Sequence, residues 1–258
     1  MIIHHVDAFI NELFKGNPAC VCVSDAPLDE NLMQKIAAEN NLSETAFLVK
    51  NGEIYNLRWF TPVSEVDLCG HATLASAFVL KSFFEPSQNE FKFSTLSGIL
   101  TVTYENGVFL LDFPVFELKE INVTEAMSRA VGAKPQQAFL GRDLLLIMEN
   151  ESDIINAKLD FGAMLELDGL ITHISAKGGE FDCVSRSFAP KLGISEDPVC
   201  GSGHCHIVPF WAKNLDKTKL KALQASARSG ILECEMMSNG RVRLGGTAVL
   251  YSKNEVFV

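Results

Sequence analysis

A short pattern occurs twice in this sequence, and the repetition limits the folds that the chain can adopt. Residues 64–73 read SEVDLCGHAT and residues 195–204 read SEDPVCGSGH, with the two Cys-Gly pairs 131 positions apart. Other matches flank both copies in the same order and at nearly the same spacing: residues 58–62 with 186–190, 97–100 with 229–232, and 106–108 with 239–241. Four matches in order indicate that the second half of the chain repeats the first.

Each half shows the same order of predicted elements. The aromatic and aliphatic run at 54–60 indicates a strand that ends at Pro62, and the Cys-Gly turn then leads into residues 71–80, which are small and apolar on all sides and predict a buried helix. The equivalent elements of the second half are a strand over 181–188 and a helix over 201–211, shortened by Pro209. After each helix, an Asn-Gly pair between alternating runs predicts a hairpin.

These elements predict an α+β fold. A helix that is apolar all round must be enclosed, and a curved antiparallel sheet can enclose it. We therefore expect two pseudo-symmetric lobes, each a curved, mostly antiparallel sheet around a central helix, with a cleft between them. The expected boundaries are 1–115 for the N-terminal lobe and 116–258 for the C-terminal lobe, with a last strand, residues 249–258, that is placed to cross back to the first lobe.

Composition excludes several classes of function. The chain of 258 residues carries a formal net charge of −10, and a uniformly acidic protein repels phosphate backbones, so we expect no nucleic-acid partner. The N-terminus lacks a basic segment before an apolar core, and the longest apolar stretch is too short to cross a bilayer, so we expect neither a signal peptide nor a membrane span. Seven cysteines without a small-domain spacing pattern favour reduced thiols in the cytoplasm.

The two Cys-Gly turns are candidate binding elements. Helices that begin directly after Cys69 and Cys200 would point free N–H groups into the cleft and attract an anion. Small residues let a ligand carboxylate or an enolate approach this backbone: Gly70, Ala72, Gly201, Ser202 and Gly203. A cofactor-independent isomerase or racemase needs such a site to remove a proton next to a carboxylate. The alternative is that both turns are only tight junctions between a strand and a helix.

Six stretches are similar as a set to the PhzF family of phenazine-biosynthesis-like isomerases. They are VDAF at 6–9, GNPA at 16–19, NLSETAF at 41–47, RWFTP at 58–62, LCGHATL at 68–74 and EDPVCGS at 196–202. The resemblance covers nearly the whole chain. It implies the two-lobed diaminopimelate epimerase-like fold, an isomerase activity without a cofactor, and a homodimer.

The resemblance also implies roles for individual residues. It places the catalytic acid/base at Glu44, with His71, Asp197 and Ser202 lining the site. Glu44 would take a proton from one carbon of a small carboxylated substrate and deliver it to another carbon on the same face. Taken from the residues alone, the apolar residues after Glu44 would raise its pKa by desolvation, while a surface glutamate paired with Ser43 is the simpler interpretation.

Two other functions stay open. More distant epimerase relatives use two cysteines, one from each turn, as acid and base, and this chain has Cys69 and Cys200 at those places. His71 argues for the isomerase, because the epimerase-type turn has asparagine there. The second alternative is a carboxylate-binding module without catalysis. We expect no metal at Cys200, His204, Cys205 and His206, because residues 204 and 206 of a helix point to different faces.

Overall fold

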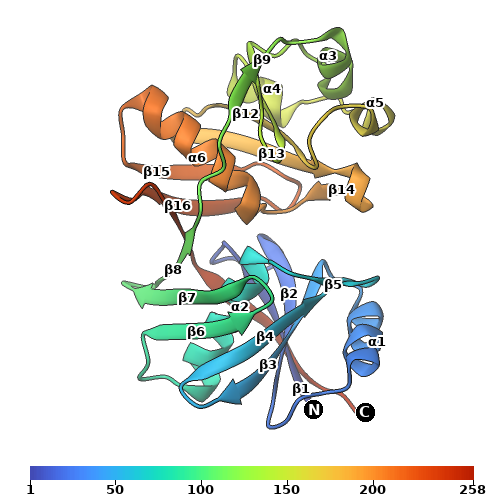
Figure 1. Ribbon diagram of the computed structural model, residues 1–258, viewed down its shortest axis with the longest axis vertical. Helices are drawn as coiled ribbons and strands as arrows, with labels where there is room; N and C mark the ends of the chain where they lie inside the picture. Colours follow the sequence, from blue (N-terminus) through green and yellow to red (C-terminus); the bar gives the residue numbers. More distant parts are fainter. The chain divides into compact units, whose positions relative to one another are not determined.

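The computed structural model describes residues 1–258, which form two compact units (Figure 1). The first unit comprises residues 1–112 together with the C-terminal residues 245–258, and the second comprises residues 113–244. None of the helices is long and apolar enough to span a membrane.

The first unit is a curved sheet with two helices. Its helices are α1 (Glu30–Asn40) and α2 (Gly70–Val79). Its strands are β1 (Ile2–Ala8), β2 (Asn17–Ser24), β3 (Glu44–Asn51), β4 (Ile54–Phe60), β5 (Glu65–Val66), β6 (Glu90–Thr95), β7 (Gly98–Glu105), β8 (Val108–Phe113), which leads out of the unit, and β18 (Ala248–Glu255). The last strand, β18, pairs antiparallel with β1, so the two ends of the chain share one sheet.

The second unit has four α-helices, of which three are short and the last is the longest of the protein. They are α3 (Glu125–Val131), α4 (Glu151–Ile155), α5 (Phe161–Leu165) and α6 (Gly201–Leu215). Its strands are β9 (Lys119–Ile121), β10 (Gln137–Leu140), β11 (Leu144–Ile147), β12 (Thr172–Lys177), β13 (Cys183–Ala189), β14 (Ile194–Asp197), β15 (Lys219–Gln224) and β16 (Gly230–Met236), and β17 (Val242–Gly246) leads back to the first unit.

The two units share one strand topology, as the duplicated sequence predicts. In the first, β1 and β2 are antiparallel, β2 and β3 parallel, β3 and β4 antiparallel, and β4 and β6 parallel. In the second, β10 to β13 and then β15 pair in the same order and with the same directions. Most pairings are antiparallel, and the parallel ones recur at equivalent places. The expected α+β architecture is therefore confirmed.

The helix α2 is the centre of the first unit. All but one of its residues from His71 to Val79 are buried, because the strands β1, β2, β3, β7 and β18 all pack against it. Its sequence is small and apolar on every side, and such a helix gains stability only when a sheet surrounds it. In Figure 1, α1 lies at the side of this unit, against β3 and β4, and covers the opposite face of the sheet. The expected buried helix after Cys69 is confirmed.

The helix α6 is longer than expected from the sequence. It continues through Pro209 to Leu215, although proline removes one helical N–H donor. The carbonyl of Cys205, which Pro209 leaves without its helical partner, accepts a hydrogen bond from the backbone N–H of Phe116 instead (3.3 Å). The prediction that Pro209 shortens this helix was wrong, because a distant segment replaces the missing donor.

The segment after β8 is part of the second unit's core. It contains β9, which pairs with β10, and α3, whose Met127 and Val131 are buried with Phe188 of β13. Thr124 caps α3 by accepting a hydrogen bond from the backbone of Met127 (3.2 Å), and Gly132 ends the helix in the left-handed region. Short helices with capped ends therefore complete this core.

Candidate active site

Glu44 stands at the first position of β3. The preceding helix α1 ends at Asn41, which adopts the left-handed conformation and turns the chain directly into the strand. The strand register places Glu44 opposite Ala19 of the parallel neighbour β2. Only 14 % of the Glu44 side chain is exposed. The carboxylate is thus carried by the first residue of an interior strand rather than by a surface loop.

Glu44, His71 and Cys69 form one buried cluster in the first unit. The Nε2 atom of His71, at the second residue of α2, lies 3.0 Å from Oε2 of Glu44. The other ring nitrogen, Nδ1, lies 3.5 Å from the Sγ atom of Cys69, the residue that precedes the helix. The two close atoms of His71 and Glu44 are not aligned as a hydrogen bond, so Oε2 of Glu44 is buried without a hydrogen-bond partner.

The environment shifts the pKa of both partners of Glu44. Burial alone lowers the pKa of His71, but Cys69 and Glu44 beside the ring more than compensate, and the pKa lies well above its ordinary value. Burial, assisted by the nearby Glu44, raises the pKa of the Cys69 thiol. Burial therefore favours the neutral thiol of Cys69, and the nearby carboxylate of Glu44 favours the protonated form of the imidazole.

The second unit holds the other residues that the sequence indicated. Asp197 ends β14, and its Oδ1 atom accepts a hydrogen bond from the backbone N–H of Val199 (3.1 Å), which shapes the turn before α6. The side chain of Gln224 closes this turn, because it accepts from the backbone N–H of Cys200 (2.9 Å) and donates to the carbonyl of Asp197 (2.6 Å). The turn is therefore held by side chains as well as by the backbone.

The helix α6 begins at Gly201, directly after Cys200. The Sγ atom of Cys200 caps it by accepting from the backbone N–H of Gly203 (3.4 Å), and it also lies 3.5 Å from the hydroxyl of Ser202. Burial, with Asp197 nearby, raises the pKa of the Cys200 thiol well above its ordinary value. The expected effect of a helix N-terminus, a lower thiol pKa, is outweighed by burial at this position.

An ion-paired cluster beside Ser202 was missed from the sequence. Asp143 is fully buried and accepts from two atoms of Arg142, Nε (3.1 Å) and Nη2 (2.6 Å), and from Nε2 of His173 (3.2 Å). The same Nη2 atom of Arg142 donates to the hydroxyl of Ser202 (3.0 Å). Burial would raise the pKa of Asp143, but the hydrogen bonds from His173 and Arg142 hold it well below its usual range. The only signal in the sequence is an Arg-Asp pair at the start of an apolar run.

Two groups of side chains have the composition of metal sites, with ligand atoms within 4.8 Å of one another. They are Glu44, Cys69 and His71 in the first unit, and Asp143, His173 and His206 in the second. In the second group, the guanidinium of Arg142 already occupies both carboxylate oxygens and places a positive charge where a cation would sit. In the first, both ring nitrogens of His71 already face Glu44 and Cys69. Charge pairing accounts for the first group, and hydrogen bonds together with charge pairing account for the second.

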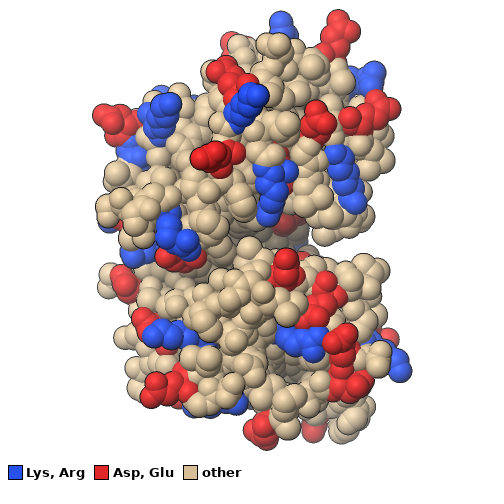
Figure 2. Space-filling view, viewed as in Figure 1, with Lys and Arg blue, Asp and Glu red and all other residues tan.

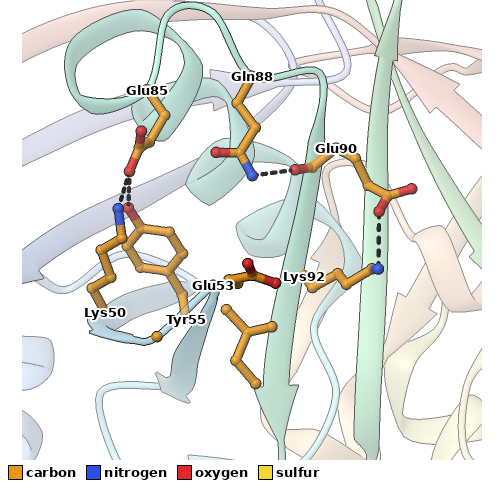
Figure 3. A pocket seen from close by; sticks show the side chains of 9 residues that line it. Lys50, Glu53, Tyr55, Glu85, Gln88, Glu90 and Lys92 are labelled. Carbon is orange, nitrogen blue, oxygen red and sulfur yellow. Dashed lines mark hydrogen bonds and ion pairs between the residues drawn. The ribbon is translucent and has the colours of Figure 1, made fainter.

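A surface pocket of about 390 Å³ lies elsewhere in the first unit (Figure 3). Its walls come from the β3–β4 hairpin and from the segment between α2 and β6. Lys50 pairs with Glu85, which also accepts from the hydroxyl of Tyr55 (3.1 Å), and Lys92 pairs with Glu90 (3.0 Å). These side chains satisfy one another across the pocket, and none of the residues indicated by the sequence lines it.

Charged residues of both signs are mixed on one face of the molecule. Figure 2 shows Lys and Arg side chains interspersed with Asp and Glu over the face in view, without a field of one sign. This face lacks the basic stripe that follows a phosphate backbone.

Known proteins resemble this chain over its whole length. The profile of the PhzC-PhzF family, described as phenazine biosynthesis-like protein, matches residues 6–254. The chain belongs to this family. An uncharacterized isomerase of Pseudomonas aeruginosa is 43 % identical over 254 residues, which cover 98 % of this chain and 97 % of that protein. This PhzF-family member is accordingly an isomerase-type enzyme.

Solved structures agree with the family assignment. A PhzF-family protein of Enterococcus faecalis is 47 % identical, with a TM-score of 0.98 and coverage of 100 % of this chain and 99 % of that one. A probable proline racemase from Agrobacterium radiobacter shares the fold at 9 % identity, with a TM-score of 0.69 and coverage of 100 % and 93 %. The epimerase-like fold expected from the sequence is confirmed.

Proposed function

We propose that this PhzF-family protein moves a proton between two carbons of a small carboxylated substrate, with Glu44 as the acid/base. The observation that carries the proposal is the buried Oε2 atom of Glu44, which lacks a hydrogen-bond partner although a histidine stands 3.0 Å away. The imidazole compensates the burial of this carboxylate by charge without occupying Oε2 with an aligned hydrogen bond, so the oxygen remains able to take up a proton.

His71 suits the task of holding this carboxylate. Its raised pKa favours the protonated ring, whose Nε2 atom lies 3.0 Å from the carboxylate of Glu44 and holds it in place by charge. Once Glu44 has taken the substrate proton, it is a neutral acid that can return the same proton to another carbon nearby. In this scheme His71 is a positioning residue, while Glu44 alone touches the reacting atoms.

The thiols fit a role as acid and base poorly. A thiol base must be deprotonated, and burial raises the pKa of both Cys69 and Cys200. Ser202, with Gly201 and Gly203, presents small residues and a hydroxyl at the start of α6, where a substrate carboxylate finds hydrogen-bond donors. Asp197 shapes this turn, and Gly70 and Ala72 give the equivalent small residues in α2.

The decisive experiment is solvent isotope exchange. A panel of small metabolic carboxylates is incubated with the enzyme in deuterated water, and deuterium incorporation and double-bond migration are followed by NMR. Glu44→Gln should lower the rate by about 10²–10⁴-fold, the usual contribution of a general acid/base. Cys69→Ser and Cys200→Ser should each retain most of the rate. The control Glu90→Gln changes an exposed carboxylate and should leave the rate unchanged.

Other results would select other functions. An active Glu44→Gln together with an inactive cysteine variant would establish the two-thiol racemase instead. A carboxylate that binds without any exchange would indicate a binding module without catalysis.

A further inference from the structure

We propose that Arg142 is the residue that recognises the substrate carboxylate in the second unit, as one half of a two-point donor site completed by the hydroxyl of Ser202. This inference deepens the proposed function and rests on it for the identity of the ligand, which is the carboxylated substrate. It adds a residue that neither the repeated pattern nor the resemblance indicated.

Arg142 is held in a single orientation before any ligand arrives. Its Nε and Nη2 atoms form a fork on the carboxylate of Asp143, which is itself fixed from the other side by Nε2 of His173. The guanidinium also lies over the ring of Phe116, with 4.8 Å between its central carbon and the ring centroid. The entropy cost of ordering a long side chain is therefore met on folding rather than on binding.

Phe116 is itself fixed by its neighbours. Its ring stacks on the buried His206 (4.7 Å between centroids, 17° between planes), and its backbone N–H replaces the helical donor that Pro209 lacks. Pro209 thus affects Arg142 indirectly. The carbonyl that the proline leaves without a helical donor binds the backbone N–H of Phe116, whose ring lies under the guanidinium.

Part of the guanidinium remains available. About a third of the Arg142 side chain (34 %) is exposed, while Asp143 beneath it is fully buried. The fork and the hydroxyl of Ser202 use Nε and Nη2, and no protein atom accepts a hydrogen bond from Nη1. A guanidinium that a carboxylate holds in place, with Nη1 left unused, can donate a charge-assisted hydrogen bond to a second carboxylate.

Arg142 also decides how Ser202 can act. A guanidinium only donates, so the Oγ atom of Ser202 accepts from Nη2 and its own hydrogen is free to donate. The nearest other partner of this hydroxyl is the Sγ atom of Cys200 at 3.5 Å, a weak acceptor. Nη1 of Arg142 and the hydroxyl of Ser202 therefore form a donor pair for the two oxygens of one carboxylate.

The test uses benzoate and its uncharged analogue benzamide as probes of the full-length protein. The Nε–H group of Arg142, slowed in exchange by its bond to Asp143, is followed by arginine side-chain ¹⁵N NMR and assigned by its loss in Arg142→Gln. We expect benzoate to shift this signal saturably in the millimolar range and benzamide to leave it in place. Arg142→Gln should weaken benzoate binding by about tenfold or more, the effect of losing a charge-assisted hydrogen bond.

Matched variants separate recognition from folding. Arg129→Gln removes an exposed arginine paired with Glu166 and should bind benzoate as the wild type does. Arg142→Lys retains the charge but loses the fork, and should restore only part of the affinity. Ser202→Ala should weaken binding less than Arg142→Gln, because it removes the weaker donor. A cooperative melting transition above the assay temperature shows that each Arg142 variant is folded, although loss of the pair with Asp143 should lower its melting temperature.

Three results would overturn the proposal: no benzoate-dependent shift of the Arg142 signal, equal binding of benzoate and benzamide, or undiminished affinity in Arg142→Gln. The proposed function fails separately. Glu44→Gln should bind benzoate normally, and if that variant kept full exchange activity, the acid/base assignment would fall while the role of Arg142 stood. Once the exchange experiment has identified a substrate, Arg142→Gln should raise the KM for it far more than it lowers kcat.

Discussion

The two units hold their Cys-Gly turns in the same way. In the first, Arg58 of β4 forms a fork on Glu65, with Nε–Oε1 and Nη2–Oε2 distances of 2.6 and 2.7 Å. In the second, Arg186 of β13 forms the same fork on Glu196, at 2.7 and 3.0 Å. Each arginine also lies over the phenylalanine two residues later in its strand, at 5.1 and 5.2 Å. The duplication has preserved these single contacts, and we refer to the arginine, its glutamate and its phenylalanine in each unit as the shared frame.

The units differ at the positions that the frame supports. The strand register identifies equivalent residues, because Phe60 pairs with Thr45 in one unit and Phe188 with Thr172 in the other. Three buried alanines of the first unit are thereby replaced in the second: Ala19 by Asp143, Ala46 by His173 and Ala72 by Gly203. One copy has a plain apolar wall, and the other has an ion-paired cluster.

Under the proposed function, this difference would separate two chemical tasks. The apolar wall of the first unit surrounds Glu44 and His71, and burial of this kind is what a proton-transferring carboxylate needs. The cluster of the second unit orients Arg142 and Ser202, which are hydrogen-bond donors. A duplicated frame can therefore carry an acid/base in one copy and anion recognition in the other.

The largest expected effect comes from turning Asp143 into the alanine of the other unit. Asp143→Ala leaves Arg142 and His173 without their shared acceptor, and breaking a buried pair in this way costs about 3–5 kcal/mol of the free energy of unfolding. Urea denaturation measures this loss. The control Asp168→Ala changes an exposed carboxylate of the same unit and should alter stability by less than about 0.5 kcal/mol. Equal effects of the two variants would show that the cluster is not a stabilising element.

The histidines of the two units should respond to pH in opposite ways. Burial lowers the pKa of His204 and of His206 to about 4, so stability falls as pH decreases below about 6.5, where these side chains take up protons only in the unfolded state. The loss between pH 7 and pH 5 should be about 2 kcal/mol for each histidine. The pKa of His71 is raised, so its contribution is complete below about 6.5 and is lost as pH rises through the folded value.

Hydrogen–deuterium exchange read separately for the two units distinguishes these effects. His206→Asn should reduce the acid sensitivity of the second unit, and His71→Gln should reduce the loss of protection of the first unit at alkaline pH. The same acid sensitivity in wild type and His206→Asn would contradict the assignment to that side chain.

The comparison of the two units also explains which features could be predicted from the sequence and which could not. The duplicated frame was readable because its signals are local: β4 spans Ile54–Phe60 as expected, and α2 begins directly after Cys69. The cluster around Asp143 was not readable, because its partners come from three separate elements that only the folded chain brings together. The end of α6 was predicted wrongly for a related reason. The backbone N–H of Phe116, which replaces the donor that Pro209 lacks, lies far from the helix in sequence.

The space beside His173 explains the glycine at position 203. A Cβ atom at Gly203 would lie 2.5 Å from the Cε1 atom of His173, whereas the equivalent residues of the first unit are both alanines, Ala72 and Ala46. Gly203→Ala should therefore destabilise the protein by about 1–3 kcal/mol, the usual cost of overpacking. In a His173→Ala background the same change should be neutral or stabilising by up to about 1 kcal/mol, because alanine is the better helix former. The two costs are compared in a double-mutant cycle, and purely additive effects would refute the steric explanation.

The smallest effects should come from the shared frame, and they test whether its two copies are equally stabilising. Arg58→Met removes a fork whose arginine is 34 % exposed, while Arg186→Met removes one whose arginine is only 14 % exposed. Water screens the first pair more strongly, so we expect a loss of about 0.5 kcal/mol for Arg58→Met and about 1–2 kcal/mol for Arg186→Met. Urea midpoints at low and high salt measure both, and salt should reduce the effect of Arg58→Met more. A larger loss of stability for Arg58→Met than for Arg186→Met would mean that the additional partner Glu30, rather than burial, determines the strength of the fork.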